Sequence, residues 1–480
     1  MKWPAVRAYW LVRAAVVTGV IATLLVSSTT ASGTPAPKSY LLLAQGNKLP
    51  GGLAAKVEAA GGSLSGSIPE IGVAFAVSSN PDFRAKASTI AGVESVSHDV
   101  STQWIAKEPR IAGPSIQAAN PPTSGDNDFF FDLQWGHDAV NAPEAWEAGA
   151  RGDGARVAVI DTGFDTDHPD LVPNINVALS RNFVPGETLT YALPDPFSHG
   201  THTAGTVAAA DNAFGTIGVA PDADLVLVKG LPDAGCGSDA PILQGVVYAA
   251  GEADADVISM SLGAPLEKSG YLEPGCSEGP EDDVWVTAQE VTETRKAWAR
   301  AVDYAMGQGA TVIASAGNDS ADKDHTNNLI DLPADTPGVI AVSATGPFGW
   351  AVDPTTNLDE PAIYTNFGQS AIDLAAPGGN LDIGLFNSGV PCTVAGVTVP
   401  CYAFDFVFST GNSGWYWSAG TSMAAPHVAG VAALIIGENG GSMSPAHVAA
   451  ALRSSADDLG KPGNDDFYGA GRVDAESAVG

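Results

Sequence analysis

The amino-acid sequence predicts a three-layer α/β domain with a mostly parallel sheet, preceded by a small α+β unit. Five short runs are almost entirely apolar and alternate with helical stretches, which suits strands covered on both faces. An earlier segment of about sixty residues shows its own alternation of strands and helices. With 480 residues, 45% of them hydrophobic, the chain can bury more than one core.

Residues 1–31 are typical of a secretory signal peptide. The basic residues Lys2, Arg7 and Arg13 precede an apolar run at residues 14–26, and small residues follow. The run is too short for a membrane span, which needs roughly 20 residues. We therefore expect a secreted, extracellular protein with no membrane attachment once the signal is removed.

Residues 38–100 are predicted to form the small α+β unit. Strands and short helices alternate along it, at Ser39–Ala44, Leu53–Ala60, Ile71–Val77, a helix capped by Asn80 and running to Ile90, and Val93–Ser97. Residues 101–128 are predicted to be a linker. From Pro109 onward this stretch is rich in Pro, Ala, Asn and Ser, which indicates an exposed chain.

Residues 129–480 hold the larger domain. Its predicted strands are Val157–Ile160, Leu225–Val228, Val257–Met260, Thr311–Ala314 and Val339–Val342. Two stretches are interpreted as loop insertions, Ala264–Val284 and Gly378–Ser413. The four cysteines fit disulfides in an oxidising compartment, and three pairings are possible on paper. Cys392 with Cys401 and Cys236 with Cys276 are favoured, because the first two are close in sequence.

The charge is strongly negative. The chain has 54 acidic and 22 basic residues, a formal net charge of −32, and nearly all of the imbalance lies after residue 110. Such a surface repels phosphate backbones and anionic lipids, so nucleic acid is an unsuitable partner. Solubility outside the cell explains the charge most simply.

Asp161 is the first candidate catalytic residue. It ends the apolar run that begins at Val157 and precedes Thr162-Gly163, so it lies at the carboxyl end of a predicted buried strand, where open α/β sheets place their sites. An aspartic protease would need a second Asp-Thr-Gly or Asp-Ser-Gly triplet, and the sequence has none.

His199 is the second candidate. It stands in the run Ser-His-Gly-Thr-His-Thr-Ala-Gly, where small residues lead into a closely packed helix. A metal pair with His202 is the alternative, but no Cys or Glu at metal-motif spacing accompanies the two histidines. A catalytic base at the first turn of the helix is the preferred interpretation.

Ser422 is the third candidate, in Gly-Thr-Ser-Met-Ala-Ala-Pro-His, at the start of an apolar helix. Free N–H groups at a helix N-terminus favour a developing negative charge. A serine needs a base to remove its proton, a role for His199, while Asp161 would hold the imidazole. The alternative for Ser422 alone is an ordinary N-cap.

The chain order Asp, His, Ser, each in its own motif, resembles the subtilisin family from about Gln134 to the C-terminus. The resemblance implies a subtilisin-like domain, and residues 38–100 look like the family's inhibitory pro-domain, of ferredoxin-like type. It implies a precursor that cuts itself after Asp99. It also implies that Asn318, in Ala-Gly-Asn, donates to the oxyanion beside the Ser422 N–H.

Three further expectations follow from the resemblance. Ser261, Leu262 and Gly263 resemble the edge segment that pairs with extended substrate. Structural Ca²⁺ is expected, with oxygen ligands from Asp170, Asn212, Ala210, Phe214 and Thr216. Asp331 is placed near the floor of the primary specificity pocket, which would favour Lys or Arg before the scissile bond, the alternative being an exposed acidic loop.

The sequence thus predicts a calcium-stabilised, secreted serine endopeptidase that acts on peptide or protein substrates through an acyl-enzyme. We expect a monomer without an organic cofactor, inhibited by its own pro-domain before maturation. Two alternatives are a peptide ligase on the same triad and a catalytically silent binding domain. The silent domain is disfavoured because all three triad residues and Asn318 are present.

Overall fold

The computed structural model describes residues 36–114, 126–276, 283–326 and 328–480. The predicted signal peptide and residues 115–125 of the predicted linker lie outside the described residues. Within these ranges no helix combines the length and the apolar character needed to cross a bilayer.

The N-terminal unit has the order βαββαβ. Its elements are β1 (Lys38–Ala44), α1 (Leu53–Ala59), β2 (Ser63–Ile68), β3 (Val73–Ser78), α2 (Phe83–Ala87) and β4 (Val93–His98). The sheet order is β2-β3-β1-β4, with every neighbouring pair antiparallel. Its core includes Leu42, Val57 and Phe83, all buried. The α+β character was predicted; strand β2 was not.

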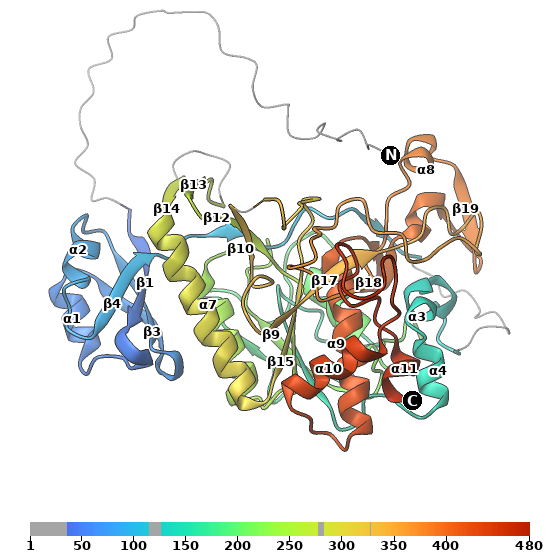
Figure 1. Ribbon diagram of the computed structural model, residues 1–480, viewed down its shortest axis with the longest axis horizontal. Coiled ribbons are helices and arrows are strands. Elements are labelled where there is room, and N and C mark those ends of the chain that lie inside the picture. Colours follow the sequence, from blue (N-terminus) through green and yellow to red (C-terminus); the bar gives the residue numbers. More distant parts are fainter. Residues whose placement is uncertain (1–35, 115–125, 277–282, 327) are drawn as a thin grey trace, which may run out of the picture. The chain divides into compact units, whose positions relative to one another are not determined.

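The larger unit is built on seven parallel strands in the order β18-β17-β15-β11-β7-β9-β8 (Figure 1). Their bounds are Leu374–Pro377, Val339–Thr345, Thr311–Ser315, Val257–Met260, Arg156–Asp161, Asp224–Lys229 and Arg181–Asn182, in that order. The five predicted runs are the five inner strands. The two edge strands, β18 and β8, were not predicted.

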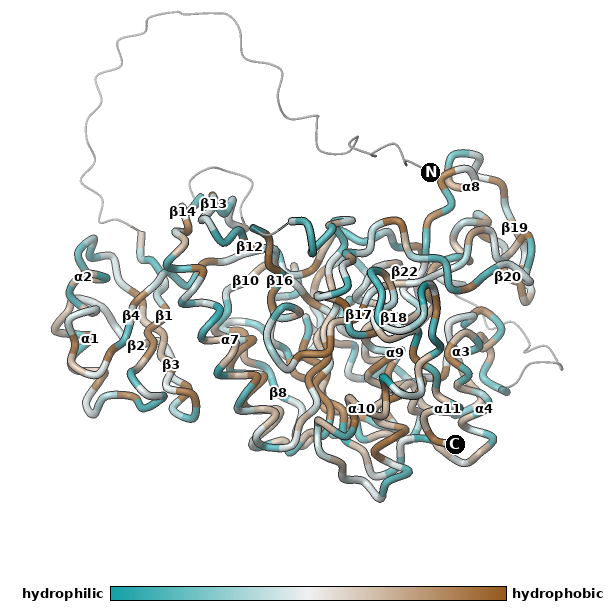
Figure 2. The backbone as a smooth tube through the Cα atoms, viewed as in Figure 1, coloured by the Kyte–Doolittle hydropathy of each residue, from teal (hydrophilic) through white to brown (hydrophobic). Residues whose placement is uncertain are grey.

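Helices cover both faces of this sheet. Val157 and Val159 of β7 pack into a core with α5 (His199–Ala208) and α9 (Thr421–Glu438). Ala158 and Ile160 pack into a second core with α6 (Asp239–Gly251) and α7 (Ala288–Gln308). Figure 2 shows hydrophobic backbone concentrated in the strands around β17 and β18. The predicted three layers are therefore present, since alternate residues of a strand face opposite sides.

Shorter helices complete the larger unit: α3 (Trp135–Ala139), α4 (Ala142–Glu147), α10 (Pro445–Ser455) and α11 (Ala475–Val479). The helices α10 and α11 pack against α9. This surrounds α9 with protein, in agreement with its nearly continuous apolar sequence.

The two predicted insertions form small β structures. In the first, β12 (Ala264–Glu267) pairs with β16 (Leu329–Leu332), and β13 (Gly270–Glu273) pairs with β14 (Val284–Thr287). The second contains α8 (Ile383–Ser388) and the hairpin of β19 (Pro391–Val394) and β20 (Val397–Pro400).

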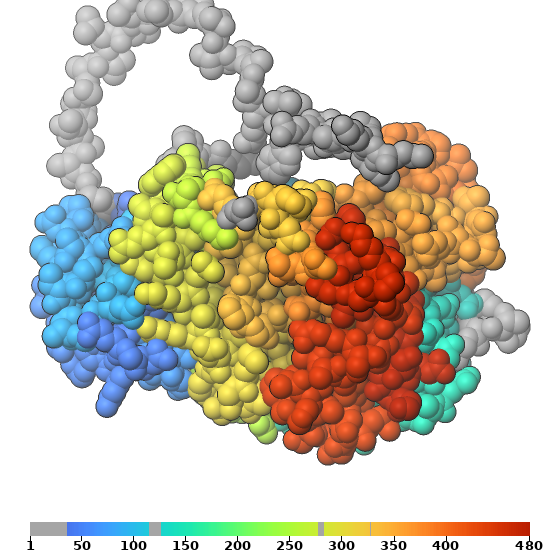
Figure 3. Space-filling view, in the orientation of Figure 1, coloured from blue at the N-terminus to red at the C-terminus, as the bar shows by residue number. Residues whose placement is uncertain are grey.

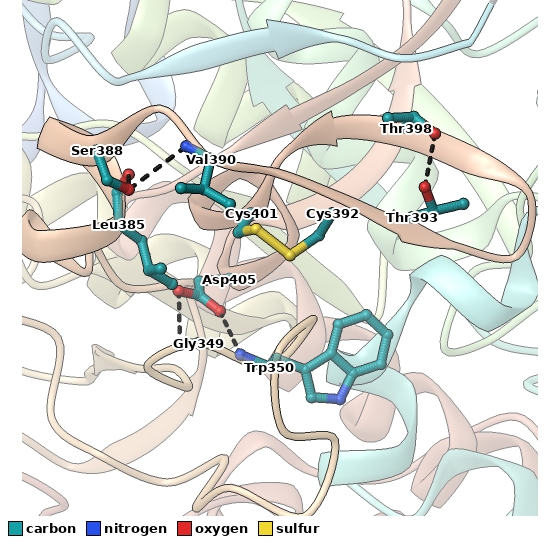
Figure 4. The surroundings of a disulfide bond; sticks show 10 residues. All are labelled: Gly349, Trp350, Leu385, Ser388, Val390, Cys392, Thr393, Thr398, Cys401 and Asp405. Carbon is teal, nitrogen blue, oxygen red and sulfur yellow. Dashed lines mark hydrogen bonds between the residues drawn. A yellow bond between two sulfur atoms is a disulfide. The ribbon is translucent and has the colours of Figure 1, made fainter.

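Both favoured disulfides are present, Cys236–Cys276 and Cys392–Cys401. The second closes the hairpin of the insertion (Figure 4). Beside it, the Asp405 carboxylate accepts the backbone N–H groups of Gly349 and Trp350 at 2.9 and 2.8 Å. These bonds tie the insertion to the loop after β17.

The stretch that follows the N-terminal unit is bound along the larger unit. Strand β5 (Thr102–Gln103) pairs with β10 (Cys236–Gly237), and β6 (Arg110–Ala112) extends the pair formed by β21 (Val407–Gly411) and β22 (Gly414–Ser418). Within the stretch predicted to be an exposed linker, Arg110 and Ala112 are exposed as expected, but residues 110–112 form a strand that was not predicted. Backbone pairing carries no strong sequence signal, so composition alone did not indicate this strand.

The N-terminal unit, blue in Figure 3, contacts the yellow α7, and ion pairs join the two. Glu94 lies 2.7 Å from Lys296 and 2.8 Å from Arg300. Glu290, whose side chain is buried, accepts from Arg84 at 3.0 Å and lies 2.8 Å from His98. This face of α7 therefore recognises the N-terminal unit by charge as well as by packing.

Candidate active site

Asp161 and His199 are joined by hydrogen bonds. Asp161 is the last residue of β7, and His199 opens α5 directly after the N-cap Ser198. The imidazole Nδ1 lies 2.8 and 3.0 Å from the two Asp161 carboxylate oxygens. The carboxylate is fully buried and also accepts the Thr162 N–H at 2.7 Å. This arrangement fixes the imidazole so that Nε2 faces away from Asp161.

Ser422 is the second residue of α9 and is buried. The Ser261 hydroxyl donates to the Ser422 carbonyl at 2.7 Å, which ties the end of β11 to the start of the helix. The helix packs closely against its neighbours: an added Cβ on Gly430 would lie only 2.5 Å from Val219. Ser422 is therefore held at a rigid helix N-terminus, where backbone N–H groups favour negative charge.

Asn318 follows β15 and a turn at Gly317, whose φ is +101°. Its amide oxygen accepts the backbone N–H of Thr421 at 2.9 Å and the Thr421 hydroxyl at 2.8 Å. Because the oxygen is taken, the amide NH₂ points the other way, and Nδ2 lies 3.4 Å from the Glu108 carboxylate. Asn318 is thus a fixed donor beside the residue that precedes Ser422.

Glu108 is a site residue that the sequence did not reveal. Its Oε2 lies 3.5 Å from His199 Nε2, and its Oε1 is the acceptor near Asn318. The carboxylate is almost fully buried, with a side-chain exposure of 3%. In the described part of the chain, neither His199 Nε2 nor Glu108 Oε2 makes a hydrogen bond. A lone glutamate before a proline in a predicted linker gives no signal for such a position.

The electrostatics of His199 follow from these neighbours. Burial alone would lower the pKa of its imidazole, but the charge and hydrogen bond of Asp161, together with Glu108, raise that pKa to about 10. Asp161, and to a smaller extent Glu108, thus favour the charged form of the imidazole. A charged imidazole cannot accept a proton from Ser422.

The predicted substrate-binding segment pairs with a piece of the chain itself. The Gly263 N–H donates to the Trp104 carbonyl at 3.0 Å, and the Trp104 N–H donates to Gly235 at 2.9 Å. A Cβ on Gly263 would meet no atom closer than 3.8 Å, the Leu332 carbonyl oxygen. Leu262 is buried in the core beneath. Gly263 thus forms a backbone hydrogen bond with residue 104 of the chain itself, and pairing of this edge with a substrate stays a prediction.

Asp331 is buried and already paired. The Lys323 ammonium contacts its carboxylate, and Asn366 Nδ2 lies 3.3 Å from it. Lys323 also lies 2.8 Å from Asp335. The charge of Asp331 is therefore compensated within the protein. Recognition of a substrate Lys or Arg by Asp331 stays a prediction, and the substrate side chain would have to compete with Lys323 for this carboxylate.

Four of the predicted calcium ligands lie in the loop of residues 210–216, and the fifth, Asp170, is hydrogen-bonded to that loop. Two carboxylate oxygens here lack a hydrogen bond among the described residues. Asp170 Oδ2 accepts from the Thr216 N–H and the Trp415 indole, both at 2.8 Å, while Asp170 Oδ1 is buried without a hydrogen bond among the described residues. Asp128 Oδ2, buried beside the same loop, likewise has no hydrogen-bonding partner there.

An acidic group at this loop could hold a metal ion. It consists of Asp126, Asp128 and Asp211, although Arg151 also reaches Asp211 at 2.6 Å. Buried anionic oxygens without donors are the ligands that Ca²⁺ prefers. The residues present therefore fit a cation, with Asp128 in addition to the predicted set.

Comparison with known proteins identifies the family. The sequence model of the Subtilase family matches residues 152–471, which contain Asp161, His199, Asn318 and Ser422. The chain belongs to the subtilase family. M-protease of Shouchella clausii is 36% identical to this subtilase over 347 residues, 72% of this chain and 70% of that protein. Subtilisin Savinase of Lederbergia lenta is 35% identical over 347 residues, covering 98% of its length. This subtilase is a serine-type endopeptidase.

Solved structures extend the likeness of fold to most of this subtilase. The epidermin leader peptide processing serine protease of Staphylococcus aureus covers 92% of this chain and 99% of its own, with a TM-score of 0.71 and 21% identity. That coverage exceeds what residues 129–480 alone could supply. Fervidolysin of Fervidobacterium pennivorans covers 93% of this chain with a TM-score of 0.64.

Proposed function

We propose that this subtilase is a secreted endopeptidase that hydrolyses peptide bonds through an acyl-enzyme and is made as a precursor that cuts itself. The observation that carries the proposal is the hydrogen-bonded pair of Asp161 and His199 beside the Asn318 amide at the N-terminus of α9. Two contacts support it: His199 and Asn318 both lie within 3.5 Å of the Glu108 carboxylate, and Asn318 bonds to Thr421 at the start of the helix that bears Ser422.

The reaction follows from these roles. His199 Nε2 takes the Ser422 hydroxyl proton while Oγ bonds to the substrate carbonyl carbon, and Asn318 Nδ2 with the Ser422 N–H stabilises the oxyanion. Collapse breaks the C–N bond, and the imidazolium gives its proton to the leaving amine. Water then attacks the acyl-enzyme by the same sequence and releases a carboxylate and free Ser422.

Self-cutting and inhibition by the N-terminal unit are supported by the path of residues 102–113. On one side of the triad this stretch pairs with β10 and Gly263, and on the other with β22. Between them it passes His199 at Glu108. We therefore place the cut within residues 105–110, and N-terminal sequencing of the matured chain tests this.

A structural calcium ion, an extracellular location and a monomeric state complete the proposal. Asp170 and Asn212, the carbonyls at Ala210, Phe214 and Thr216, and Asp128 would hold the ion. Its chemistry here is the neutralisation of buried carboxylates, with no part in the bond-breaking steps. The leader of residues 1–31, the cysteine usage and the acidic surface support export.

The decisive experiment treats the matured protein with a fluorophosphonate and maps the adduct by mass spectrometry. We expect one adduct on Ser422, absent from Ser422→Ala and strongly slowed in His199→Ala, with parallel losses of casein hydrolysis. An adduct on another serine, or full reactivity in His199→Ala, would contradict the proposed mechanism.

A further inference from the structure

Glu108 places a carboxylate where the reaction must take place. Each of its oxygens faces one of the proposed catalytic groups. Oε1 lies 3.4 Å from Nδ2 of Asn318, the oxyanion donor, and Oε2 lies 3.5 Å from Nε2 of His199, the base. Glu108 also lies against Gly420, the first residue of the nucleophile motif, where an added Cβ would collide with Oε1. No substrate carbonyl can enter while the side chain is there.

The chemistry of this group suits an inhibitor. A carboxylate between the oxyanion donor and the base has the form of a hydrolysis product, with one oxygen for each partner. It is a poor electrophile and carries no leaving group, so Ser422 cannot acylate itself on it. The contact therefore blocks the site without being consumed.

The charge of Glu108 adds a second effect. With Asp161 on Nδ1 and Glu108 near Nε2, the imidazole of His199 lies between two carboxylates. This environment favours imidazolium, which cannot act as a base. Glu108 thus affects both the space for the substrate and the protonation state of the base.

Neighbouring contacts hold Glu108 in place from both sides. Residues 102–105 are anchored by β10, Gly235 and Gly263, and residues 110–113 by β22. Between them the Glu108 N–H donates to the Ala106 carbonyl at 2.9 Å, a tight turn that directs the side chain inward. The adjacent Lys107 is exposed.

We propose that Glu108 is a latch of the uncut chain: while its carboxylate fills the reaction space between His199 and Asn318, Ser422 is unreactive, and self-cutting requires this side chain to leave that space. This inference rests on the proposed function. It assigns to one side chain an inhibitory effect beyond the covering of the cleft by the N-terminal unit.

A small reagent can test the latch without removing the segment. A cavity of about 380 Å³, lined by Ala106, Lys107, Glu108 and His199 among others, borders the site. Diisopropyl fluorophosphate, which is of a size to enter, reacts when a Ser422 Oγ–P bond forms, the P–F bond breaks, and His199 takes the hydroxyl proton. Intact-mass spectrometry then reads the adduct separately on uncut and cut chains in one sample.

The comparison uses the full-length chain and three variants. We expect Ser422 of uncut Glu108→Ala to be labelled at least about tenfold faster than in the uncut native chain. Glu108→Gln keeps the volume but loses the charge, so its rate should be intermediate. Glu58→Ala, which removes an exposed carboxylate of α1 away from this cavity, should match the native rate. Cut chains of all four proteins should label rapidly.

Two results would overturn the latch. If uncut Glu108→Ala labels no faster than the native uncut chain while cut chains label rapidly, the peptidase function stands and Glu108 is not the latch. If no variant yields a cut chain, or cut chains do not label, the proposed function fails and the inference fails with it.

Discussion

The amide of Asn318 shows how a single side chain is oriented for a task. Its oxygen accepts two hydrogen bonds from Thr421, so its NH₂ group cannot rotate away from the cleft without losing both. Catalysis by such a donor depends on its being fixed before the charge develops. Thr421 is therefore a positioning residue for Asn318, and it also adjoins Ser422 in the chain.

Replacing Asn318 with alanine should lower kcat by about 10²–10³, the loss known from removing such a donor in a subtilisin, with little change in KM. The donor acts on charge that exists only in the transition state. Steady-state kinetics on a peptide amide measures this. Asn366→Ala is the matched control, since Asn366 bonds the same turn at Ala316. It should lower Tm but reduce kcat much less than Asn318→Ala does. Equal kcat in Asn318→Ala and the native enzyme would contradict the oxyanion role.

At this scale the sequence identified the residues that occur in motifs and missed those defined by contacts. Asp161, His199, Ser422 and Asn318 each stand in a run of small or apolar residues whose local structure is predictable. Glu108 reaches the site through the path of a poorly patterned stretch. Lys323 compensates Asp331 through a contact eight residues apart in sequence, and no periodicity indicates that pairing.

Among the elements, the docking of the N-terminal stretch depends on a buried pair of carboxyls. Asp99 follows β4, and its Oδ1 accepts the Asp239 N–H at 3.1 Å, at the start of α6. Asp239 itself accepts the Trp298 indole of α7 at 2.6 Å. Burial raises the pKa of both groups, and the charge of Asp239 raises that of Asp99 further. The pair therefore joins the N-terminal stretch to α6 and α7 most favourably when it carries a proton.

This pair predicts a pH dependence of the bound N-terminal unit. A raised pKa means that the stabilisation is complete below the usual carboxyl pKa near 4 and is lost as pH rises through the raised value, about 7 for Asp99. After self-cutting, the N-terminal fragment should co-elute with the peptidase at pH 5 and separate more readily at pH 8 in gel filtration. Asp99→Asn, which keeps the acceptor, should reduce the difference. Identical elution of the native protein at both pH values would oppose this.

Element prediction succeeded where burial was uniform. The inner strands are mostly apolar because both faces are covered, so their sequences stand out. Strand β2 lies at a sheet edge with alternating exposure and contains Gly66, and β8 has two residues; both were missed. Short edge strands are defined by their neighbours, which a local pattern does not show.

For the whole molecule, the dominant feature is excess negative charge, −32 over 480 residues. Self-repulsion of this size opposes compaction, although it favours solubility. Some carboxylates are compensated by Arg and Lys, but Asp128 Oδ2 and Asp170 Oδ1 are buried without a donor among the described residues. A divalent cation at their shared loop would offset this cost.

Calcium should therefore stabilise the folded protein. At 100-fold excess over Kd, a ligand of the native state contributes about 2.7 kcal/mol, so Tm should rise by on the order of 5 °C relative to the chelated protein. Calorimetry with Ca²⁺ and with a chelator measures the difference. Asp128→Asn and Asp170→Asn should each reduce this difference in Tm.

Asp405→Asn, which changes a buried carboxyl in the disulfide-bonded insertion, is the control. It should keep the full difference in Tm, because the Asp405 carboxylate is already satisfied by two N–H groups. A native Tm that is the same with and without Ca²⁺ would mean that the loop holds no ion and that its buried carboxyls are protonated instead.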